Sequence, residues 1–370
     1  MCRSFWCGNA KLQREPDTRS RLGGAMTSQL TSMTTVRQSS TVEATTDLVE
    51  HTTGSTSTSS RDAAFYFHCA VVVIGVVGTA ANGLVLYAMV ASNQHKKHVL
   101  IFNQNLLDLV SCLFMAITYA VRLCDIYLDG TRGYLLCLTV FSEGPGWGPF
   151  LSSLINLAAI SIERYLKVVH PALAKKKLRK WTIYSAMAFA WISGTAVAAG
   201  ATVPTTDVVN GVCYTLVFWK SRAAQMAFGI WYFLSFYVII LLIFVFCYWR
   251  ILIAIRRQAS VMAAHSAAGA STAQSHSKQI QTNVIKTMII VSVLFAITWA
   301  PGQIFHLLLN INSTLTLHES FFAAILFITY IYVCANPFIY ATKFDPVRRI
   351  LLSLIPCKQT TQPVDSIEMT

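Results

Sequence analysis

Long apolar segments alternate with short polar ones along most of this chain. Five apolar blocks contain no Asp, Glu, Lys or Arg, namely residues 69–94, 181–206, 223–247, 287–305 and 320–342. Two more are nearly as apolar: residues 99–120, with the single acid Asp108, and residues 144–162. A helix needs about 20 residues to cross roughly 30 Å of hydrocarbon, and its backbone groups must be satisfied within the segment. The pattern predicts an all-α membrane protein, a bundle of seven transmembrane helices.

Composition and charge agree with this class and add an orientation. Of the 370 residues, 54% are hydrophobic and only 12% are charged, too few to cover an ordinary soluble protein. The loops after the first, third and fifth helices and the C-terminal tail hold seventeen Lys and Arg without Arg164, whereas the other loops hold four. Because positive charge stays on the cytoplasmic side, we expect an extracellular N-terminus and a cytoplasmic C-terminus. The net charge of +13 then reflects topology and attraction to membrane lipid, and no nucleic-acid partner is expected.

Four regions are expected along the chain. Residues 1–62 form a Ser/Thr-rich extracellular tail that cannot bury a core and suits O-glycosylation. Residues 63–343 form the helical domain, residues 344–356 an amphipathic eighth helix, and residues 357–370 a cytoplasmic tail. No apolar signal-peptide core precedes the tail, so the first helix is expected to target the chain. Met26 or Met33 is an alternative start, because either leaves a tail of uniform composition.

Polar residues and prolines recur inside the predicted helices in a recognisable order. They are Asn82 in GTAANGLVLY, Asp108 in NQNLLDLVSCLF, Glu163, Arg164 and Tyr165 in SIERYLKVVHP, Trp191 in the fourth helix, Tyr248 in FCYWRI, Phe295, Trp299 and Pro301 in VLFAITWAP, and Asn336, Pro337 and Tyr340 in NPFIYATKF. Together these motifs resemble the rhodopsin-like (class A) G-protein-coupled receptors. Each motif alone is weak, whereas seven in the right helices and order are specific.

The resemblance implies a plasma-membrane receptor that activates heterotrimeric G proteins and engages arrestin and a receptor kinase. Arg164 would pair with Glu163 at rest and, on activation, meet the G protein, steadied by Tyr248 and Tyr340. The alternative for Arg164 is a side chain that merely reaches the lipid headgroups. Many relatives carry an acid near the start of the sixth helix that braces this arginine. Here Gln281 stands about there, so we expect appreciable basal signalling.

The sixth and seventh helices each carry a proline that removes a backbone hydrogen bond and makes a hinge. In the sixth helix, Trp299 precedes Pro301 by two residues, and Phe295 lies one turn before Trp299. A buried tryptophan beside a proline is often simple core packing. The resemblance favours a switch instead, in which ligand moves Trp299 and the helix swings outward. The seventh helix carries a comparable proline hinge, with the residues Asn336, Pro337 and Tyr340.

Asp108 is the one acid deep in a predicted span. It is either a hydrogen-bonded structural carboxyl or, by resemblance, part of a sodium site shared with Ser153 and Asn336, since a hard cation prefers oxygen ligands. Tyr332 and Val333 stand where relatives often offer further polar groups. No other cofactor is expected.

The candidate ligand-binding residues form an aromatic group with few polar members: Trp147, Phe150, Trp299, Gln303, His306 and Tyr330. For His306 a packed imidazole is an equal alternative. Counting back from Arg164 places Gly146 where amine receptors carry an Asp, which disfavours an amine ligand. Tyr330 stands where opsins carry their retinal Lys. The resemblance therefore favours a non-amine extracellular ligand, preferably a peptide.

The second outer loop contains two β-branched and aromatic runs around Asn210-Gly211, which predicts a hairpin with a two-residue turn. Such a hairpin is common in peptide-type relatives. By resemblance, Cys213 in this loop forms a disulfide with Cys137, with Cys124 as an alternative to Cys137. Disulfides are expected only outside the cell, and Cys69, Cys112, Cys247 and Cys334 are interpreted as packing residues.

Two modification sites are also predicted. Asn312 begins the sequon NST in the third outer loop, which suits N-glycosylation. Cys357 follows a basic amphipathic run, which suits palmitoylation beside the membrane. Residues 256–278, rich in Ala and Ser, are expected to be a disordered inner loop.

The stretch GPGWGPF, residues 144–150, interrupts the third helix with three glycines and two prolines. Arg164 lies 27 residues after Cys137, two more than is usual in this family. Two extra helical residues would turn Cys137 roughly 200° away from its partner. We therefore expect a bulge or unwound turn within residues 144–150 that corrects the register and presents Trp147 and Phe150 to the pocket.

Two other classes remain as alternatives. A seven-helix transporter or channel would show internal repeats and a charged pathway, and neither is found in the sequence. A constitutive receptor without a ligand is the closer alternative. An enzyme is not expected, because no metal-ligand spacing or nucleophile triad stands out, and the nine histidines are scattered.

Overall fold

A computed structural model describes residues 53–124, 126–265, 272–312, 319–343 and 345–353. Several predictions therefore lie outside the described residues. They are most of the N-terminal tail, the alternative starts Met26 and Met33, the palmitoylation site Cys357, and the cytoplasmic tail.

Most of the described chain is helical. The long helices are α3 (Thr53–Ala91), α4 (Val99–Arg122), α6 (Gly144–Val169), α8 (Lys180–Thr202), α9 (Arg222–Phe233), α10 (Ile239–His265), α11 (Thr272–Ile311) and α12 (Glu319–Lys343). Short elements are η1 (Gln94–Lys96), α5 (Gly130–Leu136), η2 (Cys137–Phe141), α7 (Pro171–Lys177), η3 (Val203–Thr205), η4 (Leu234–Val238) and α13 (Asp345–Ser353), with strands β1 (Asp207–Val209) and β2 (Val212–Tyr214). The helix α9 continues into α10 through the π-helical turn η4.

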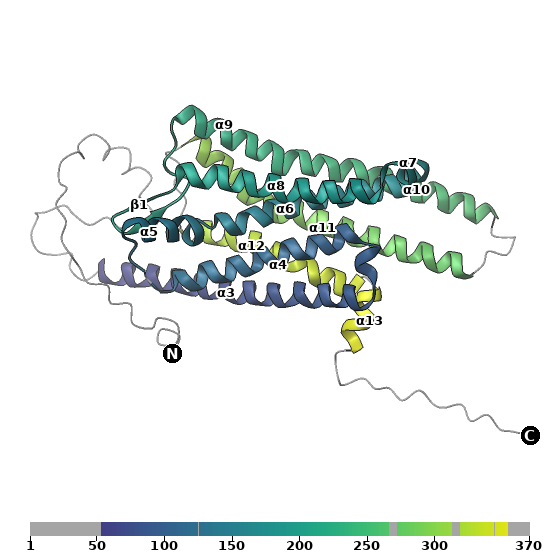
Figure 1. Cartoon of the computed structure of the whole chain (residues 1–370), viewed down its shortest axis with the longest axis horizontal. Helices are drawn as coiled ribbons and strands as arrows, with labels where there is room; N and C mark the ends of the chain where they lie inside the picture. Colours follow the sequence, from purple (N-terminus) through teal and green to yellow (C-terminus); the bar gives the residue numbers. More distant parts are fainter. Residues whose placement is uncertain (1–52, 125, 266–271, 313–318, 344, 354–370) are drawn as a thin grey trace, which may run out of the picture.

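The long helices lie roughly side by side and form a bundle (Figure 1). The strand β1 and α5 lie at one end of the bundle, together with the start of α3, whereas α7 and α13 lie at the other end. The helix α6 is central, because it packs against α4, α8 and α10. These contacts place residues from four helices around one interior.

Within the described part of the chain, six helical spans are long and apolar enough to cross a membrane. They are Asp62–Ala91, Val99–Arg122, Lys180–Thr205, Arg222–Arg257, Met288–Ile311 and Phe321–Ile339. The expected third span, α6, is not among them, although it is 26 residues long. Glycine, proline and serine in its first half lower its hydropathy. Such a helix suits the centre of a bundle, where protein rather than lipid surrounds it.

The beginning of α6 differs from the prediction made for GPGWGPF. The chain is α-helical from Gly144 onward. Pro145 lies in the first turn, where a missing N–H breaks no hydrogen bond, and Pro149 lies inside the helix, which continues through it. The irregularity lies just upstream. Cys137–Phe141 is a π-helical turn, and Glu143 caps α6 in the left-handed region at φ 59°. The interpretation of residues 144–150 as a bulge or unwound turn is therefore wrong. Cys137 begins the π-helical turn, which holds more residues than an α-helical turn. Glu143, in the left-handed region, then lies directly before α6.

Cys137 and Cys213 form a disulfide, with an S–S distance of 1.99 Å, so the prediction of this bridge is confirmed over the alternative with Cys124. Next to it, β1 and β2 pair antiparallel, with Val209 opposite Val212. The two residues between them, Asn210 and Gly211, both have positive φ, 51° and 76°, as a type I′ turn requires. The carbonyl of Gly211 accepts a hydrogen bond from the Leu128 amide at 3.1 Å, which ties the turn to the segment between α4 and α5.

Two other expected boundaries differ from the structure. The helix α10 extends to His265 and α11 begins at Thr272, so the prediction of a disordered loop over residues 256–278 is wrong for most of that stretch. Its alanines favour helix strongly, which the prediction underweighted. The helix α3 also begins at Thr53, before its apolar span starts at Asp62. The short helix α13 lies within the range expected for an amphipathic eighth helix, with Val347 buried and Arg348 and Arg349 exposed.

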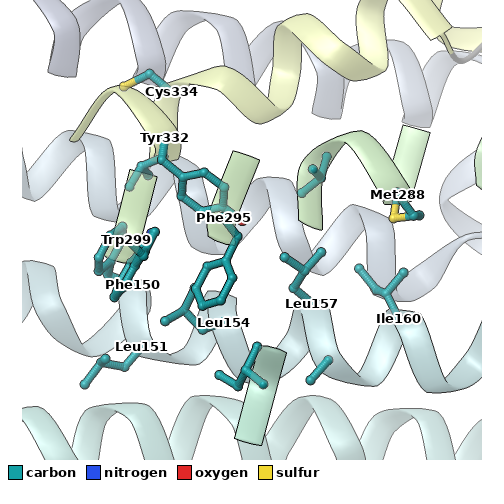
Figure 2. Packing of buried hydrophobic residues seen from close by; sticks show 14 of the residues in the cluster. Phe150, Leu151, Leu154, Leu157, Ile160, Met288, Phe295, Trp299, Tyr332 and Cys334 are labelled. Carbon is teal, nitrogen blue, oxygen red and sulfur yellow. The ribbon is translucent and has the colours of Figure 1, made fainter. Parts of the chain in front are cut away.

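The centre of the bundle is filled by aromatic and aliphatic side chains from α6, α11 and α12 (Figure 2). On α6 the buried positions Phe150, Leu154, Leu157 and Ile160 recur every three or four residues, which is the spacing of one helix face. Trp299 of α11 is 1% exposed and lies against this face. The core therefore runs along α6 from Phe150 to Ile160.

Candidate functional site

A small cavity of about 30 Å³ lies between α4, α6 and α12. It is lined by Ser111, Phe114, Met115, Thr118, Tyr119, Glu143, Gly146, Trp147, Phe150, Tyr330 and Val333. Three of the six predicted ligand-binding residues, Trp147, Phe150 and Tyr330, are among them. Their rings contact one another, since Trp147 lies 5.1 Å from Phe150 and 6.5 Å from Tyr330 between centroids.

The other three predicted ligand-binding residues lie on α11, outside this lining. Trp299 is directly beneath the cavity, because its ring stacks on Phe150 at 4.7 Å. Gln303 is buried one turn further along. His306 packs instead against the α9 ring of Tyr232 at 5.0 Å, the packed arrangement that the sequence left equally open. The structure thus gathers Trp147, Phe150, Tyr330 and Trp299, and places His306 elsewhere.

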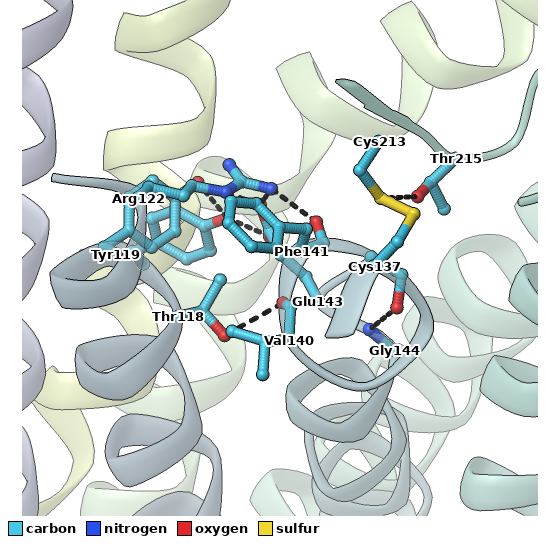
Figure 3. A network of polar contacts seen from close by, with 12 residues as sticks. Thr118, Tyr119, Arg122, Cys137, Val140, Phe141, Glu143, Gly144, Cys213 and Thr215 are labelled. Atoms are coloured by element: carbon cyan, nitrogen blue, oxygen red, sulfur yellow. Dashed lines mark hydrogen bonds and ion pairs between the residues drawn. A yellow bond between two sulfur atoms is a disulfide. The ribbon is translucent and has the colours of Figure 1, made fainter. Parts of the chain in front are cut away.

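Glu143 is a polar centre of the site that the sequence interpretation missed (Figure 3). Its carboxylate forms an ion pair with Arg122 at 2.9 Å and accepts hydrogen bonds from the hydroxyls of Tyr119 at 3.1 Å and Tyr330 at 2.8 Å. The two tyrosine hydroxyls are also 3.0 Å apart. Arg122 donates to the Phe141 carbonyl at 2.7 Å, and its guanidinium lies 4.9 Å above the Tyr119 ring. The network links α4, α12 and the residue that caps α6.

Trp299 connects the cavity to the deeper core. Its ring lies 5.5 Å from Phe295 and 6.3 Å from Tyr332, while Phe150 covers its other side. Within the described ranges, neither Trp299 Nε1 nor Gln303 Oε1 has a hydrogen-bond partner, although both atoms are buried. A buried polar atom without a partner destabilises this arrangement. Trp299 and Gln303 are therefore suited to a rearrangement in which Nε1 and Oε1 gain hydrogen-bond partners.

Asp108 lies in a polar cluster at the middle of the bundle and is 1% exposed. Its carboxylate accepts hydrogen bonds from Ser153 at 2.6 Å, Asn336 at 2.8 Å and Gln104 at 3.3 Å. The three residues proposed from sequence for a sodium site are thus brought together. Gln104, which the sequence interpretation missed, joins them and also hydrogen-bonds Ser153.

The cluster continues across the bundle to the motif tryptophan of the fourth helix. Gln104 Oε1 accepts from Asn156 at 2.8 Å, and Asn156 Oδ1 accepts from Asn103 at 3.0 Å. The Trp191 indole then donates to Asn103 Oδ1 at 3.0 Å. These buried amides bind α4, α6 and α8 together, which gives Trp191 a structural role.

The C-terminal end of α6 carries the expected pair of charges. Glu163 and Arg164 are 5% and 7% exposed, and Arg164 Nη2 lies 3.3 Å from Glu163 Oε2. Lys167 also pairs with Glu163. One turn earlier, the hydroxyls of Ser161 and Tyr248 are 2.8 Å apart. Arg164 is therefore held inside the bundle rather than directed to lipid headgroups.

A further partner of Arg164 was not foreseen. His98, the residue before α4, places Nδ1 3.3 Å from Arg164 Nη2. Because a guanidinium only donates, His98 accepts here through an unprotonated Nδ1. Burial, and then the positive charge of Arg164, lower the pKa of His98 from 6.5 to about 4. The contact thus favours a neutral imidazole.

The remaining predicted residues are placed as follows. Pro301 lies inside α11 and Pro337 inside α12, and both helices continue through the proline. Tyr165 is hydrogen-bonded to His170 Nε2 at 3.1 Å. Asn312, exposed, directly follows α11. The side chain of Tyr340 lies outside the description.

Comparison with known proteins gives one family and several distant relatives. The model of the 7 transmembrane receptor (rhodopsin family) matches residues 81–340. The chain is 24% identical to galanin receptor type 1 of Rattus norvegicus over 307 residues, covering 78% of this chain and 82% of the relative. It is 24% identical to melanopsin of Felis catus over 301 residues (78% and 60%) and 24% identical to neuropeptide Y receptor type 2 of Macaca mulatta over 322 residues (81% and 77%).

Proposed function

Because this chain belongs to the rhodopsin family of seven-transmembrane receptors, we propose that it binds an extracellular peptide and activates heterotrimeric G proteins. The family consists of receptors rather than enzymes. The observation that carries the proposal is the stack of Phe150 on Trp299, 4.7 Å between centroids. Phe150 lines the cavity, and Trp299 belongs to the core that reaches the end of α6 bearing Arg164. A ligand that displaces Phe150 thus acts directly on Trp299.

Three observations favour a peptide ligand. Two relatives are named for galanin and neuropeptide Y. The paired strands β1 and β2 are tied through Cys213 and Cys137 to η2, which precedes α6, and this arrangement suits a cover over the site. Tyr330 occupies the position where a retinal-binding opsin would carry its lysine.

The membrane arrangement is part of the proposal. We propose that α6 also spans the membrane, as the third of seven spans in chain order and in addition to the six described above. We place α13 as an amphipathic helix on the cytoplasmic surface of the plasma membrane. Basic residues that follow α3, α6 and α10 favour the end with α7 and α13 as the cytoplasmic one. Arrestin, a receptor kinase and membrane lipid are the partners expected there, Cys357 is a palmitoylation site, and Asn312 an extracellular glycosylation site.

We also propose that the Asp108 cluster binds sodium, because Asp108, Ser153 and Asn336 present oxygen atoms around one buried carboxylate. Replacing choline chloride by sodium chloride should raise the melting temperature of the purified receptor, and Asp108→Asn should abolish the difference. An equal effect of sodium on both proteins would contradict the site.

A receptor with substantial ligand-independent activity is the second candidate. It is favoured by Gln281, which stands near the position where many relatives carry an acid that braces the arginine. A transporter or channel is the third.

Nucleotide exchange measured on purified receptor in lipid nanodiscs separates these functions. Each main class of G protein is added with and without a synthetic peptide library, and ion flux is measured in parallel in liposomes. Peptide-dependent exchange that disappears in Arg164→Ala supports the proposal. High exchange without peptide supports the second candidate. Ion flux without exchange would overturn both.

A further inference from the structure

The carboxylate of Glu143 gives the cavity a specific chemistry. Of the described residues that line it, Glu143 alone carries a charge, while Phe114, Tyr119, Trp147, Phe150 and Tyr330 contribute aromatic rings. A carboxylate together with aromatic faces attracts a cation through charge and through the electron-rich ring faces. An anionic group gains neither of these attractions.

The carboxylate keeps the capacity to bind one more donor. A carboxylate accepts about four hydrogen bonds, and three are taken. Oε1 accepts from Arg122 and Tyr119, whereas Oε2 accepts only from Tyr330 among the described residues. One acceptor position on Oε2 thus remains.

The size of the cavity selects among cations. A volume of about 30 Å³ holds about two water-sized groups. A primary ammonium with its adjoining methylene has that size, whereas a planar guanidinium is larger. Gly146 helps to leave this space, since a Cβ there would already lie 3.4 Å from the Phe114 Cβ.

The geometry also changes what the sequence suggested about cationic ligands. Gly146, where amine receptors carry an aspartate, supplies no charge, and the sequence therefore disfavoured an amine. Glu143 lies three residues earlier and turns the chain in the left-handed region at φ 59° before α6 begins. Glu143 consequently lines the same cavity as Gly146.

We propose that Glu143 anchors a primary ammonium group of the ligand, and that Arg122 is an internal competitor that neutralises Glu143 until the ligand arrives. The inference rests on the proposed peptide function and specifies the recognised group, either a lysine side chain or a free N-terminus. Arg122 is placed for this exchange, because its Phe141 carbonyl partner and the Tyr119 ring can retain the guanidinium after Glu143 leaves it.

The first test uses small probes and needs no identified ligand. n-Butylammonium chloride, sodium butyrate and n-butanol are each titrated into purified receptor, and the shift in melting temperature is measured against each variant's own baseline. The ammonium should stabilise the wild type more than the other two probes. Glu143→Gln keeps the size, and its amide can accept from one tyrosine hydroxyl and donate to the other. It should weaken ammonium binding about tenfold, as loss of a charged hydrogen bond does.

Two further variants make the result specific. Arg122→Met keeps an unbranched chain over Tyr119 but removes the competitor, so ammonium should bind several-fold more tightly than to wild type. Asp207→Asn removes an exposed acid of β1 outside the cavity and should change nothing. Stronger butyrate than ammonium binding, equal ammonium binding in Glu143→Gln, or weaker binding in Arg122→Met would each overturn the proposal.

The second test separates the two sources of ammonium and separates this proposal from the receptor function. Three peptide libraries are compared in nucleotide exchange: free N-termini without lysine, acetylated N-termini with lysine, and acetylated N-termini without lysine. Activity of the first or second identifies the source and supports the anchor. Equal activity of the third overturns the anchor and leaves the peptide receptor standing. Inactivity of all three counts against the peptide function, while the probe titration still decides the role of Glu143.

Discussion

The side chain of Arg164 is restrained by two partners, one on its own helix and one at the start of α4. Glu163 holds its guanidinium from the same helix at 3.3 Å, and His98 accepts from it at 3.3 Å from the start of α4. The sequence suggested a weakly restrained arginine, because Gln281 stands where relatives carry an acid. The hydrogen bond from Arg164 to His98 is a restraint that the sequence interpretation did not include. The level of basal signalling therefore tests how strongly this hydrogen bond holds Arg164.

Replacing His98 should release Arg164 in part. Loss of one hydrogen bond to a charged group shifts a two-state equilibrium by about 1.5 kcal/mol, or about tenfold. We expect His98→Leu to raise ligand-free nucleotide exchange by about that factor. His95→Leu is the matched control, because His95 lies in the same turn and contacts the Met89 carbonyl instead. Unchanged exchange in His98→Leu would show that the contact restrains nothing.

The same histidine predicts a dependence of stability on pH. Burial and the charges of Arg164, Lys167 and Lys97 lower the pKa of His98 to about 4, against an opposing effect of Glu163. As pH falls from about 6.5 to about 4, His98 becomes protonated in the unfolded chain but stays neutral in the folded receptor. The free energy of unfolding therefore falls as pH falls. The melting temperature of wild type should drop by several degrees more than that of His98→Leu over this interval. Parallel curves would refute the assignment.

At the scale of elements, α6 and α8 approach each other more closely than side chains normally allow. A Cβ on Gly194 would lie 2.5 Å from the Ser152 amide nitrogen and 2.8 Å from the Gly148 carbonyl oxygen. Backbone atoms cannot move aside as a flexible side chain would. The contact between these helices therefore depends on glycine at this position of α8.

Gly194→Ala should destabilise the bundle by about 1–3 kcal/mol, the usual range for overpacking. Gly200→Ala on the same helix is the control, because a Cβ there meets nothing within 4 Å and alanine favours helix. Thermal unfolding of the two purified variants compares them directly. A Gly194→Ala receptor as stable as Gly200→Ala would show that the helices separate without cost.

The elements also show where sequence reasoning succeeds and where it fails. Hydropathy predicted the long helices, because satisfying the backbone in lipid is a requirement on each segment by itself. The hairpin turn followed from Asn210-Gly211, whose local conformational preference decides the turn. The irregularity in the third helix was misplaced. It lies at Cys137–Phe141 and Glu143 rather than within residues 144–150, and the partners of Glu143, Arg122 and Tyr330, belong to other helices.

At the scale of the whole molecule, charge asymmetry predicts topology. An N-terminal epitope tag should be detected by antibody on intact cells, and a C-terminal tag only after permeabilisation. Asn312→Gln should remove one N-linked glycan, seen as a mobility shift that glycosidase treatment abolishes in wild type. A C-terminal tag detected on intact cells would reverse the proposed orientation.

The sequence alone determined the class of the molecule and its family, because hydropathy, charge and motif order are properties of the chain read in one dimension. By resemblance it favoured a disulfide between Cys137 and Cys213 but left Cys124 open, and the structure decided that pairing. The sequence also predicted the convergence of Asp108, Ser153 and Asn336, since the family resemblance carries that arrangement. Only the tertiary structure decided the polar chemistry of the cavity. Tyr330 is 187 residues from Glu143 in sequence, yet their side chains are 2.8 Å apart. Such a partnership exists only once the helices have packed, and no local pattern encodes it.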